Sequence, residues 1–421
     1  MYLADSQPWF IGFSGGKDSS MVASLVFEAV QSVSACQRTK AVSIVSTDTR
    51  VELPAIEGML GNTLRLMNDA AAQHAMNITA HLLRPAVEES FWANLIGRGY
   101  PPPNRHFRWC TQRLKIDPFI RFVEAGLGHW GQAILHLGAR RSESSARARM
   151  LSRKRTVSSL RRHPDLPGIL VSNPIEHLST EEVWAYLLQK PSPWGGDNRK
   201  LYRLYAAAGG GECPVQLDTS TPSCGNSRFG CWTCTVVERD KAGEGLKANG
   251  DERMRDLLEF RAFLLEVQDP ANGWRDARRT NGAKAPGPLT MRARKELLGR
   301  LLRLQDSVGF KLVGNDELLV IQRYWNSSRL PDSGTGVARL ILENKGLDMR
   351  TTNGITILER LQDAVCSRRG LSTDTLRRLT EKVREYGESH RAHGLPDELI
   401  GILRDDPAMQ EHLVQEESRG A

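Results

Sequence analysis

Short apolar runs alternate with amphipathic segments along the first half of the chain. The apolar runs, several of them rich in β-branched residues, predict strands over residues 9–13, 41–47, 77–83 and 133–137. Between these runs, apolar residues recur at steps of three and four over 21–30 and 52–74, and a further helix is expected from about 111 to 123. Because strands and helices alternate, we predict an α/β fold with a doubly wound parallel sheet.

Beyond residue 240 the pattern becomes helical. The candidate helices there cover residues 254–267, 290–304, 317–325, 355–365 and 373–386. We therefore expect three regions: an α/β domain over residues 1–200, a cysteine-bearing region over 201–245 and a helical C-terminal region over 246–421.

Composition places the chain among ordinary globular proteins. Of its 421 residues, 25% are charged and 40% are hydrophobic, and no apolar run approaches the length of a membrane span. The N-terminus lacks the features of a signal peptide, so we expect a cytoplasmic protein. In a reducing compartment, seven cysteines favour metal ligands or redox groups over disulfides. The net charge of +8 permits a polyanionic partner.

The most informative segment is Phe-Ser-Gly-Gly-Lys-Asp-Ser-Ser at residues 13–20, between the first predicted strand and the first predicted helix. Two glycines let the backbone approach an anion, the N–H groups of the turn and of the helix point at it, and Ser14 and Lys17 add donors. A capped strand-to-helix turn would also favour Ser, Gly and Asp, but it does not require Lys among the glycines. The segment predicts a phosphate-binding loop.

This segment resembles the SGGxDS loop of the PP-loop ATP pyrophosphatases, which have an adenine nucleotide α-hydrolase-like fold. In that group the loop holds the pyrophosphate end of ATP, the bond between the α and β phosphates is broken, and AMP is usually transferred. The resemblance implies ATP, with Mg²⁺, as cofactor, and implies catalytic roles for Lys17, Asp18 and Arg140. It implies pyrophosphate binding by Ser14, Gly15, Gly16, Lys17, Asp18 and Ser19.

Two further strand ends extend the resemblance. Asp48, after the second predicted strand, is similar to the residue at which these proteins bind adenosine, although Asp is also a common turn former. The segment 138–147 resembles the Arg-rich loop of adenylyl-sulfate reductases and sulfate adenylyltransferases, and the planar fork of arginine suits phosphate oxygens. The resemblance implies nucleotide binding by Arg140, Arg141 and Arg147.

The basic character continues past this loop. Residues 140–163 contain eight arginines and one lysine against a single acidic residue, Glu143. One part is expected to reach nucleotide. For the distal part, residues 153–162, both a longer polyanion and plain solvent exposure remain open.

Four cysteines follow in the pattern Cys213-x10-Cys224-x6-Cys231-x2-Cys234, on a segment rich in Gly and Pro. Four thiolates so close in sequence can converge on one metal site. Zinc and a 4Fe-4S cluster both accept four cysteines, and the spacing leaves both open.

Two of the other cysteines are assigned separately. Cys110 precedes a predicted helix, has arginines nearby and resembles the Cys-x-x-x-Leu-Lys segment of the reductases. A sulfur-carrying or redox role and a non-reacting thiol near the active site are both open. Cys36 is predicted to be a buried residue of a helix.

The segment 226–237, together with 278–282, 287–290 and 294–298, resembles the sulfurtransferase of bacterial DNA phosphorothioation, of the DndC and SspD types. The match spans most of residues 9–325. It implies an ATP pyrophosphatase that helps replace a non-bridging oxygen of the DNA backbone by sulfur, within a DNA modification and restriction system. It also implies a cysteine desulfurase of the DndA or SspA type as sulfur donor, and other phosphorothioation proteins as partners. The implied ligands of a 4Fe-4S cluster in region 201–245 are Cys213, Cys224, Cys231 and Cys234.

Three alternatives are weighed against this assignment. An adenylyl or phosphoadenylyl sulfate reductase would close with a C-terminal Cys or carry an adjacent Cys-Cys pair, whereas the last cysteine here is Cys366. A tRNA-thiolating enzyme places its Cys pairs differently. A non-catalytic reading, in which the chain is a scaffold that binds ATP, DNA and a metal, would be distinguished by the absence of pyrophosphate release.

Overall fold

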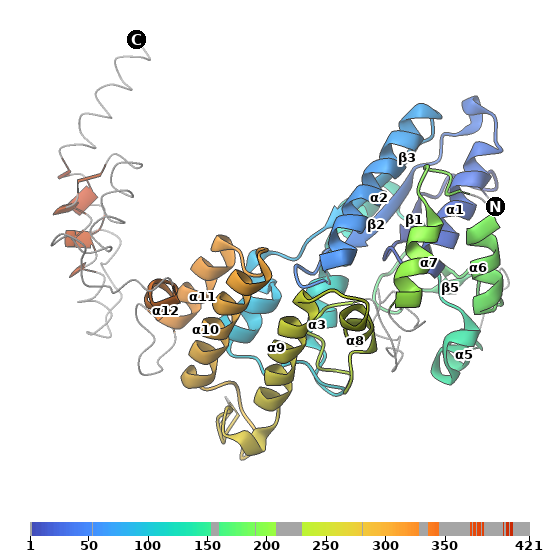
Figure 1. The fold of residues 1–421 in the computed structure, drawn as a ribbon. Helices are drawn as coiled ribbons and strands as arrows, with labels where there is room; N and C mark the ends of the chain where they lie inside the picture. The colour runs from blue at the N-terminus through green and yellow to red at the C-terminus, as the bar shows by residue number, and fades with distance from the viewer. Residues whose placement is uncertain are drawn as a thin grey trace, which may run out of the picture. The chain divides into compact units, whose positions relative to one another are not determined.

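The computed structural model describes residues 2–52, 54–152, 160–189, 191–207, 230–279, 281–327 and 336–344, with isolated residues between 371 and 406 (Figure 1). The chain forms two compact units, Met1–Leu340 and Ile341–Ala421. The predicted helix at 355–365 lies outside the described residues, and that at 373–386 is only partly within them. The predicted boundaries near residues 200 and 245 stay predictions.

A six-stranded sheet forms the centre of the α/β part, in the order β3-β2-β1-β4-β6-β5. The strands are β1 (Trp9–Gly12), β2 (Val42–Thr47), β3 (Ile78–Leu83), β4 (Ala133–His136), β5 (Arg161–Arg162) and β6 (Ile169–Ser172). β1 pairs in parallel with β2 and β4, with Ile11 opposite Ile44 and His136, and β5 is an antiparallel edge strand. The strand order reverses next to β1, and ligands bind at such a switch point in open α/β sheets.

Helices cover both faces of this sheet because its side chains alternate between two cores. On one face, Trp9 and Ile11 pack with α1 (Lys17–Gln31), α2 (Pro54–Gln73) and α6 (Thr180–Gln189). On the other, Phe10 packs with Phe119 and Val123 of α4 (Asp117–Trp130). The predicted doubly wound α/β fold is therefore confirmed.

The later helices pack against a segment from the first half of the chain. α9 (Arg253–Gln268) contacts α10 (Met291–Val308), and both α10 and α11 (Asn315–Ser327) pack on the π-helix η3 (Ala93–Arg98) (Figure 1). Two side chains fix this contact: Arg294 Nε and Trp325 Nε1 donate to the Ile96 carbonyl oxygen over 2.7 and 2.8 Å. The remaining helices are η1 (Ala35–Gln37), η2 (Val87–Glu89), α3 (Trp109–Thr111), η4 (Gln112–Ile116), η5 (Arg141–Glu143), α5 (Ser145–Ser152), α7 (Asn198–Ala207), α8 (Lys241–Ala248), η6 (Pro270–Asn272) and α12 (Gly336–Asn344).

One cysteine prediction is wrong. Cys36 is exposed, in the short turn η1 after α1, whereas a buried helical position was expected. The reason is that α1 ends at Gln31, so the apolar spacing does not continue to Cys36. None of the helices in the described ranges is both long enough and apolar enough to cross a membrane.

Candidate functional site

The loop between β1 and α1 has the backbone features that were expected of an anion-binding loop. Gly16 stands at the N-cap of α1 and no side chain caps the helix, while Gly15 adopts a left-handed conformation at φ 75°. Ser14 Oγ accepts from the Gly16 N–H at 3.3 Å, and Ser19 Oγ donates to the Gly16 carbonyl at 3.0 Å. These bonds hold the loop in shape, and the N-terminus of α1 carries the partial positive charge that favours phosphate. ATP fits this loop by the chemistry of its donors.

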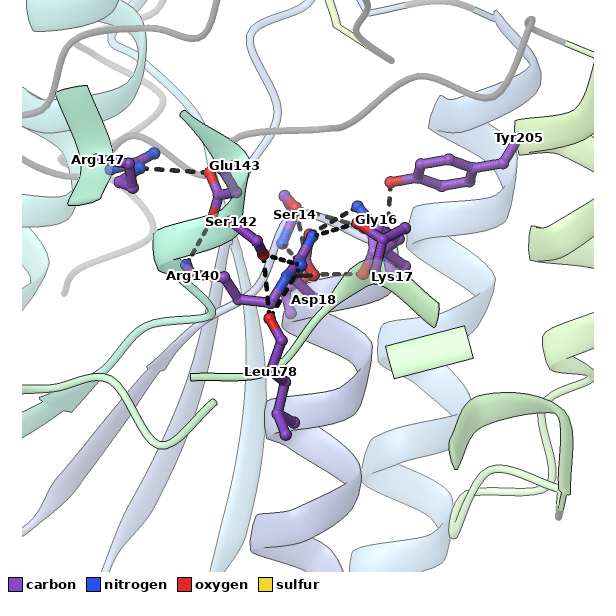
Figure 2. A network of polar contacts seen from close by, with 12 residues as sticks. Ser14, Gly16, Lys17, Asp18, Arg140, Ser142, Glu143, Arg147, Leu178 and Tyr205 are labelled. Carbon is purple, nitrogen blue, oxygen red and sulfur yellow. Dashed lines mark hydrogen bonds and ion pairs between the residues drawn. The ribbon is translucent and has the colours of Figure 1, made fainter. Parts of the chain in front are cut away.

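Beneath the loop lies a buried ion-pair network (Figure 2). The Asp18 carboxylate forms ion pairs with Lys17 Nζ at 3.0 Å and with Arg140 Nε at 2.6 Å. The three residues are 3%, 1% and 0% exposed, respectively. Arg140 also donates to Ser142 Oγ at 2.7 Å and to the Leu178 carbonyl at 3.2 Å. In the structure, Arg140 therefore contacts the first turn of α1, so its geometry is that of a positioning residue.

Gly138, which the sequence analysis did not single out, permits this contact. A Cβ atom at this position would lie 2.8 Å from the carbonyl carbon of Asp18. Only glycine lets the loop after β4 lie this close to α1. A glycine directly after a predicted strand was the available signal. Tyr205 of α7 was missed too; its hydroxyl accepts from the Lys17 N–H at 3.3 Å, and its ring lies 5.5 Å from Lys17 Nζ.

The other two predicted nucleotide-binding arginines pair with carboxylates. Arg147 is 3% exposed, and its Nε lies 3.3 Å from Glu143 Oε2 (Figure 2). Arg141 Nη2 lies 3.6 Å from Glu176 Oε1. Both arginines lie near the loop that follows β4, as the sequence suggested, but each contacts an acidic partner that the sequence analysis did not assign. Of the distal basic run, residues 153–159 lie outside the described ranges.

Asp48 lies at the carboxyl end of β2 and is buried. Its two carboxylate oxygens accept from Arg84 Nε and from the Arg50 N–H, each at 2.8 Å. Arg50 has a positive φ of 62°, a backbone conformation that residues other than glycine rarely adopt. The Arg50 side chain lies 2.8 Å from Asp316 on α11, so it joins the end of β2 to α11.

The loop that begins at Asp48 leads directly to the cysteine segment. Glu52 and Cys231 form an isolated antiparallel bridge, and the Trp232 N–H donates to the Val51 carbonyl at 3.1 Å. The Thr49 hydroxyl lies 2.8 Å from Glu52 Oε1 and 3.3 Å from Cys231 Sγ. The predicted nucleotide end of β2 and the predicted metal segment, 179 residues apart in sequence, are therefore in contact.

Cys231 and Cys234 stand on one tight turn, in which the Cys234 N–H donates to the Cys231 carbonyl at 3.1 Å. The thiol of Cys110 is close enough for electrostatic interaction with Cys234, and burial together with Cys234 raises the pKa of Cys110 to about 11. Burial, and next the carboxylate of Glu52, raise the pKa of Cys231 well above its usual value. Such thiols stay protonated at neutral pH unless a cation or metal stabilises the thiolate.

The other two cysteines of the predicted quartet, Cys213 and Cys224, lie outside the described residues. Among the residues that are described, no three His, Cys, Asp or Glu side chains are arranged to hold a metal ion. The 4Fe-4S cluster, the zinc alternative and Mg²⁺ stay predictions. Two of the four cysteines do share one turn, as a Cys-x-x-Cys ligand pair requires.

Aromatic packing fixes both cysteine segments. The ring centre of Trp232, which lies between Cys231 and Cys234, is 5.9 Å from the ring centre of Trp92. The ring centres of Trp92 and Phe91 are 4.9 Å apart. Phe91 stacks on Trp109, the neighbour of Cys110, at 5.4 Å. One buried aromatic row therefore holds Cys110 and the Cys231–Cys234 turn in a fixed relation.

Comparison with known proteins agrees with this architecture. The model of the phosphoadenosine phosphosulfate reductase domain matches residues 8–237, more than half of the chain. The chain belongs to this family. The match includes the β1–α1 loop and the segment of Cys231 and Cys234, and it ends before α8. Helices α8 to α11 of this reductase-domain family member therefore lie outside the family domain.

Two individual proteins are similar to the chain. An uncharacterised protein of Methanocaldococcus jannaschii is 27% identical over 237 residues, which cover 56% of this chain and 38% of that protein. The matched part is thus well under half the length of that relative. The structure of the U34-tRNA thiolase NcsA from Methanococcus maripaludis with its [4Fe-4S] cluster aligns at 11% identity and a TM-score of 0.29. It covers 63% of this chain and 74% of that one.

Proposed function

We propose that this protein is an ATP pyrophosphatase and sulfurtransferase of DNA phosphorothioate modification. The observation that carries the proposal is the contact between Glu52 and Cys231, because it brings a cysteine pair to the end of the strand that borders the phosphate loop. A nucleotide site and a sulfur site that lie next to each other are what adenylylation followed by sulfur transfer needs.

In the first half-reaction, the β1–α1 loop binds the β and γ phosphates of ATP through its backbone N–H groups and Lys17. A non-bridging oxygen of the DNA backbone attacks the α-phosphorus, the bond to the bridging oxygen breaks, and pyrophosphate leaves. Asp18 and Arg140 hold the first turn of α1 and the loop in place. Mg²⁺ would offset the charge of the phosphates.

In the second half-reaction, the adenylylated oxygen becomes part of a good leaving group. The terminal sulfur of a persulfide, supplied by a cysteine desulfurase, attacks the DNA phosphorus, and AMP departs with the oxygen. A second thiol then attacks the cysteine sulfur of the donor, the S–S bond breaks, the terminal sulfur stays on the DNA phosphorus, and the donor cysteine and the second thiol form a disulfide. We propose Cys110 for that role, because it lies near Cys234. A 4Fe-4S cluster, proposed on Cys213, Cys224, Cys231 and Cys234, would supply a redox-active centre that binds sulfur.

The same contact between Glu52 and Cys231 supports a second candidate, thiolation of a tRNA base. There AMP would activate a carbonyl oxygen of the base, and sulfur would displace it in the same way. The two candidates share ATP cleavage and differ in the acceptor.

The test is pyrophosphate release from ATP by the purified full chain, with and without duplex DNA. Lys17→Ala is expected to lower the release at least about 100-fold, since electrostatic contacts to the reacting phosphates are typically worth that much. Lys40→Ala is the matched control, because Lys40 is also a buried lysine paired with an aspartate, Asp5, but it lies before the amino end of β2, whereas the phosphate loop lies at the carboxyl ends of the strands. Equal release by the parent chain and Lys17→Ala would refute the proposal.

A further inference from the structure

A loop just before Cys110 carries features that the proposed catalytic steps do not use. Residues 101–116 contain four Lys and Arg residues and no Asp or Glu. Phe107 is 43% exposed, and it is the one phenylalanine among the exposed large hydrophobic residues of the described ranges. An exposed aromatic ring within a basic segment is the usual composition of a surface that binds single-stranded nucleic acid.

This loop is held in one shape by its own hydrogen bonds. The Asn104 side-chain oxygen accepts from the N–H groups of His106 and Phe107 at 2.8 and 2.9 Å. The backbones of Asn104 and Phe107 also bond to each other in both directions, at 3.2 and 3.3 Å. An ordered turn therefore holds the Phe107 ring in its exposed position. Because little chain entropy is lost when a ligand binds there, the entropic cost of binding is lower.

The exposed ring continues the aromatic row that holds the cysteines. The ring centres of Phe107 and Tyr100 are 6.0 Å apart, and those of Tyr100 and Trp109, the neighbour of Cys110, are 5.7 Å apart. Three residues of extended chain span at most about 11 Å, so the backbone of Phe107 lies within about that distance of Cys110. A base stacked on Phe107 would place its own phosphate near the sulfur site.

The cations of the loop can meet a phosphate backbone. The Arg105 side chain is 70% exposed, and its carboxylate neighbour, Glu238, lies 3.9 Å away and is 92% exposed, so this pair is weak. His106 is exposed as well, and Arg108 precedes the helix that bears Cys110. A second basic loop, residues 275–289, lies next to this segment, because the Leu289 N–H donates to the Gly99 carbonyl at 2.7 Å. This second loop bears Arg278, Arg279 and Lys284, all exposed, and none of them pairs with a carboxylate among the described residues.

We infer that residues 104–108 form a docking surface for a single-stranded or locally unpaired stretch of DNA, on which Phe107 stacks with a base and Arg105 contacts the backbone. The choice of DNA rests on the proposed function. The existence of the surface is argued from the loop alone and does not depend on the proposed function. Pairing in duplex DNA hides the faces of the bases, so a stacking contact requires that at least one base leaves the helix.

The test is fluorescence anisotropy of the full chain with labelled single-stranded DNA, the matching duplex and RNA of the same sequence. Phe107→Ala is expected to weaken binding of single-stranded DNA about tenfold, and Phe107→Trp to retain it. Tyr202→Ala is the control, because Tyr202 is 44% exposed, and its expected change is under about twofold. Arg105→Ala should make the slope of log affinity against log salt shallower by about 0.7, whereas Arg65→Ala, an exposed arginine on α2, should not.

Pyrophosphate release from ATP by the parent chain is measured on the same samples at a saturating concentration of DNA, so that the two proposals can fail separately. Release that persists while Phe107→Ala binds DNA as the parent does would overturn the docking surface alone. No pyrophosphate release by the parent chain in the presence of saturating DNA would instead reject the proposed function. Phe107-dependent binding that is tighter for RNA than for DNA would contradict the choice of DNA.

Discussion

At the scale of single residues, burial decides how Arg140 acts. The sequence correctly placed an arginine after β4, because a run of Gly, Ala and Arg follows the predicted strand. It could not show that the guanidinium turns inward to Asp18, since this depends on Gly138 and on the packing of α1. Arg140 is 0% exposed and contacts Asp18, and its contact with a nucleotide stays a prediction.

Arg140→Met is therefore expected to lower the free energy of unfolding by about 3 kcal/mol, because it leaves Asp18 buried with one partner fewer. Urea denaturation measures this loss. Arg65→Met, which removes an exposed arginine paired with Asp69, is expected to cost less than about 1 kcal/mol. An Arg140→Met variant that is as stable as the parent chain but no longer binds ATP would show a direct ligand role instead.

At the scale of elements, hydrophobic periodicity was a good guide for the four strands that precede the basic run. The predicted strands at 9–13, 41–47, 77–83 and 133–137 agree with β1 to β4 to within one residue at each end. β6, with four residues, and α5 were missed because they lie within or beside the basic run, where charged residues obscure the pattern. The contact between the β2–α2 loop and Cys231 was not predictable, since it joins segments that are distant in sequence.

This contact has one polar side chain at its centre, Thr49. Thr49→Val keeps the shape but removes the hydroxyl, so we expect pyrophosphate release to stay within about twofold while sulfur incorporation into DNA falls about tenfold, the effect of roughly one hydrogen bond to a charged group. Thr47→Val is the matched control, because the buried Thr47 hydroxyl has no hydrogen-bond partner in the structure of the described residues. A parallel fall of both activities, or of neither, would contradict a specific link between the two sites.

At the scale of the whole molecule, the helices α10 and α11 pack onto the family domain, although they lie outside the matched range. The match to the phosphoadenosine phosphosulfate reductase domain ends at residue 237, yet α10 and α11 pack on η3, which lies inside the matched range. The Arg50 contact with Asp316 ties α11 to the end of β2. The sequence predicted these helices but not their partner, because their apolar faces do not identify the surface that covers them.

The most direct test of the central claim is the phosphorothioate content of DNA from cells that carry the intact modification locus, measured by mass spectrometry of digested DNA. We expect sulfur-linked dinucleotides with the parent chain and with Lys40→Ala, and their loss with Lys17→Ala and with Cys231→Ser. Unchanged phosphorothioate content in both the Lys17→Ala and the Cys231→Ser cells would contradict the account.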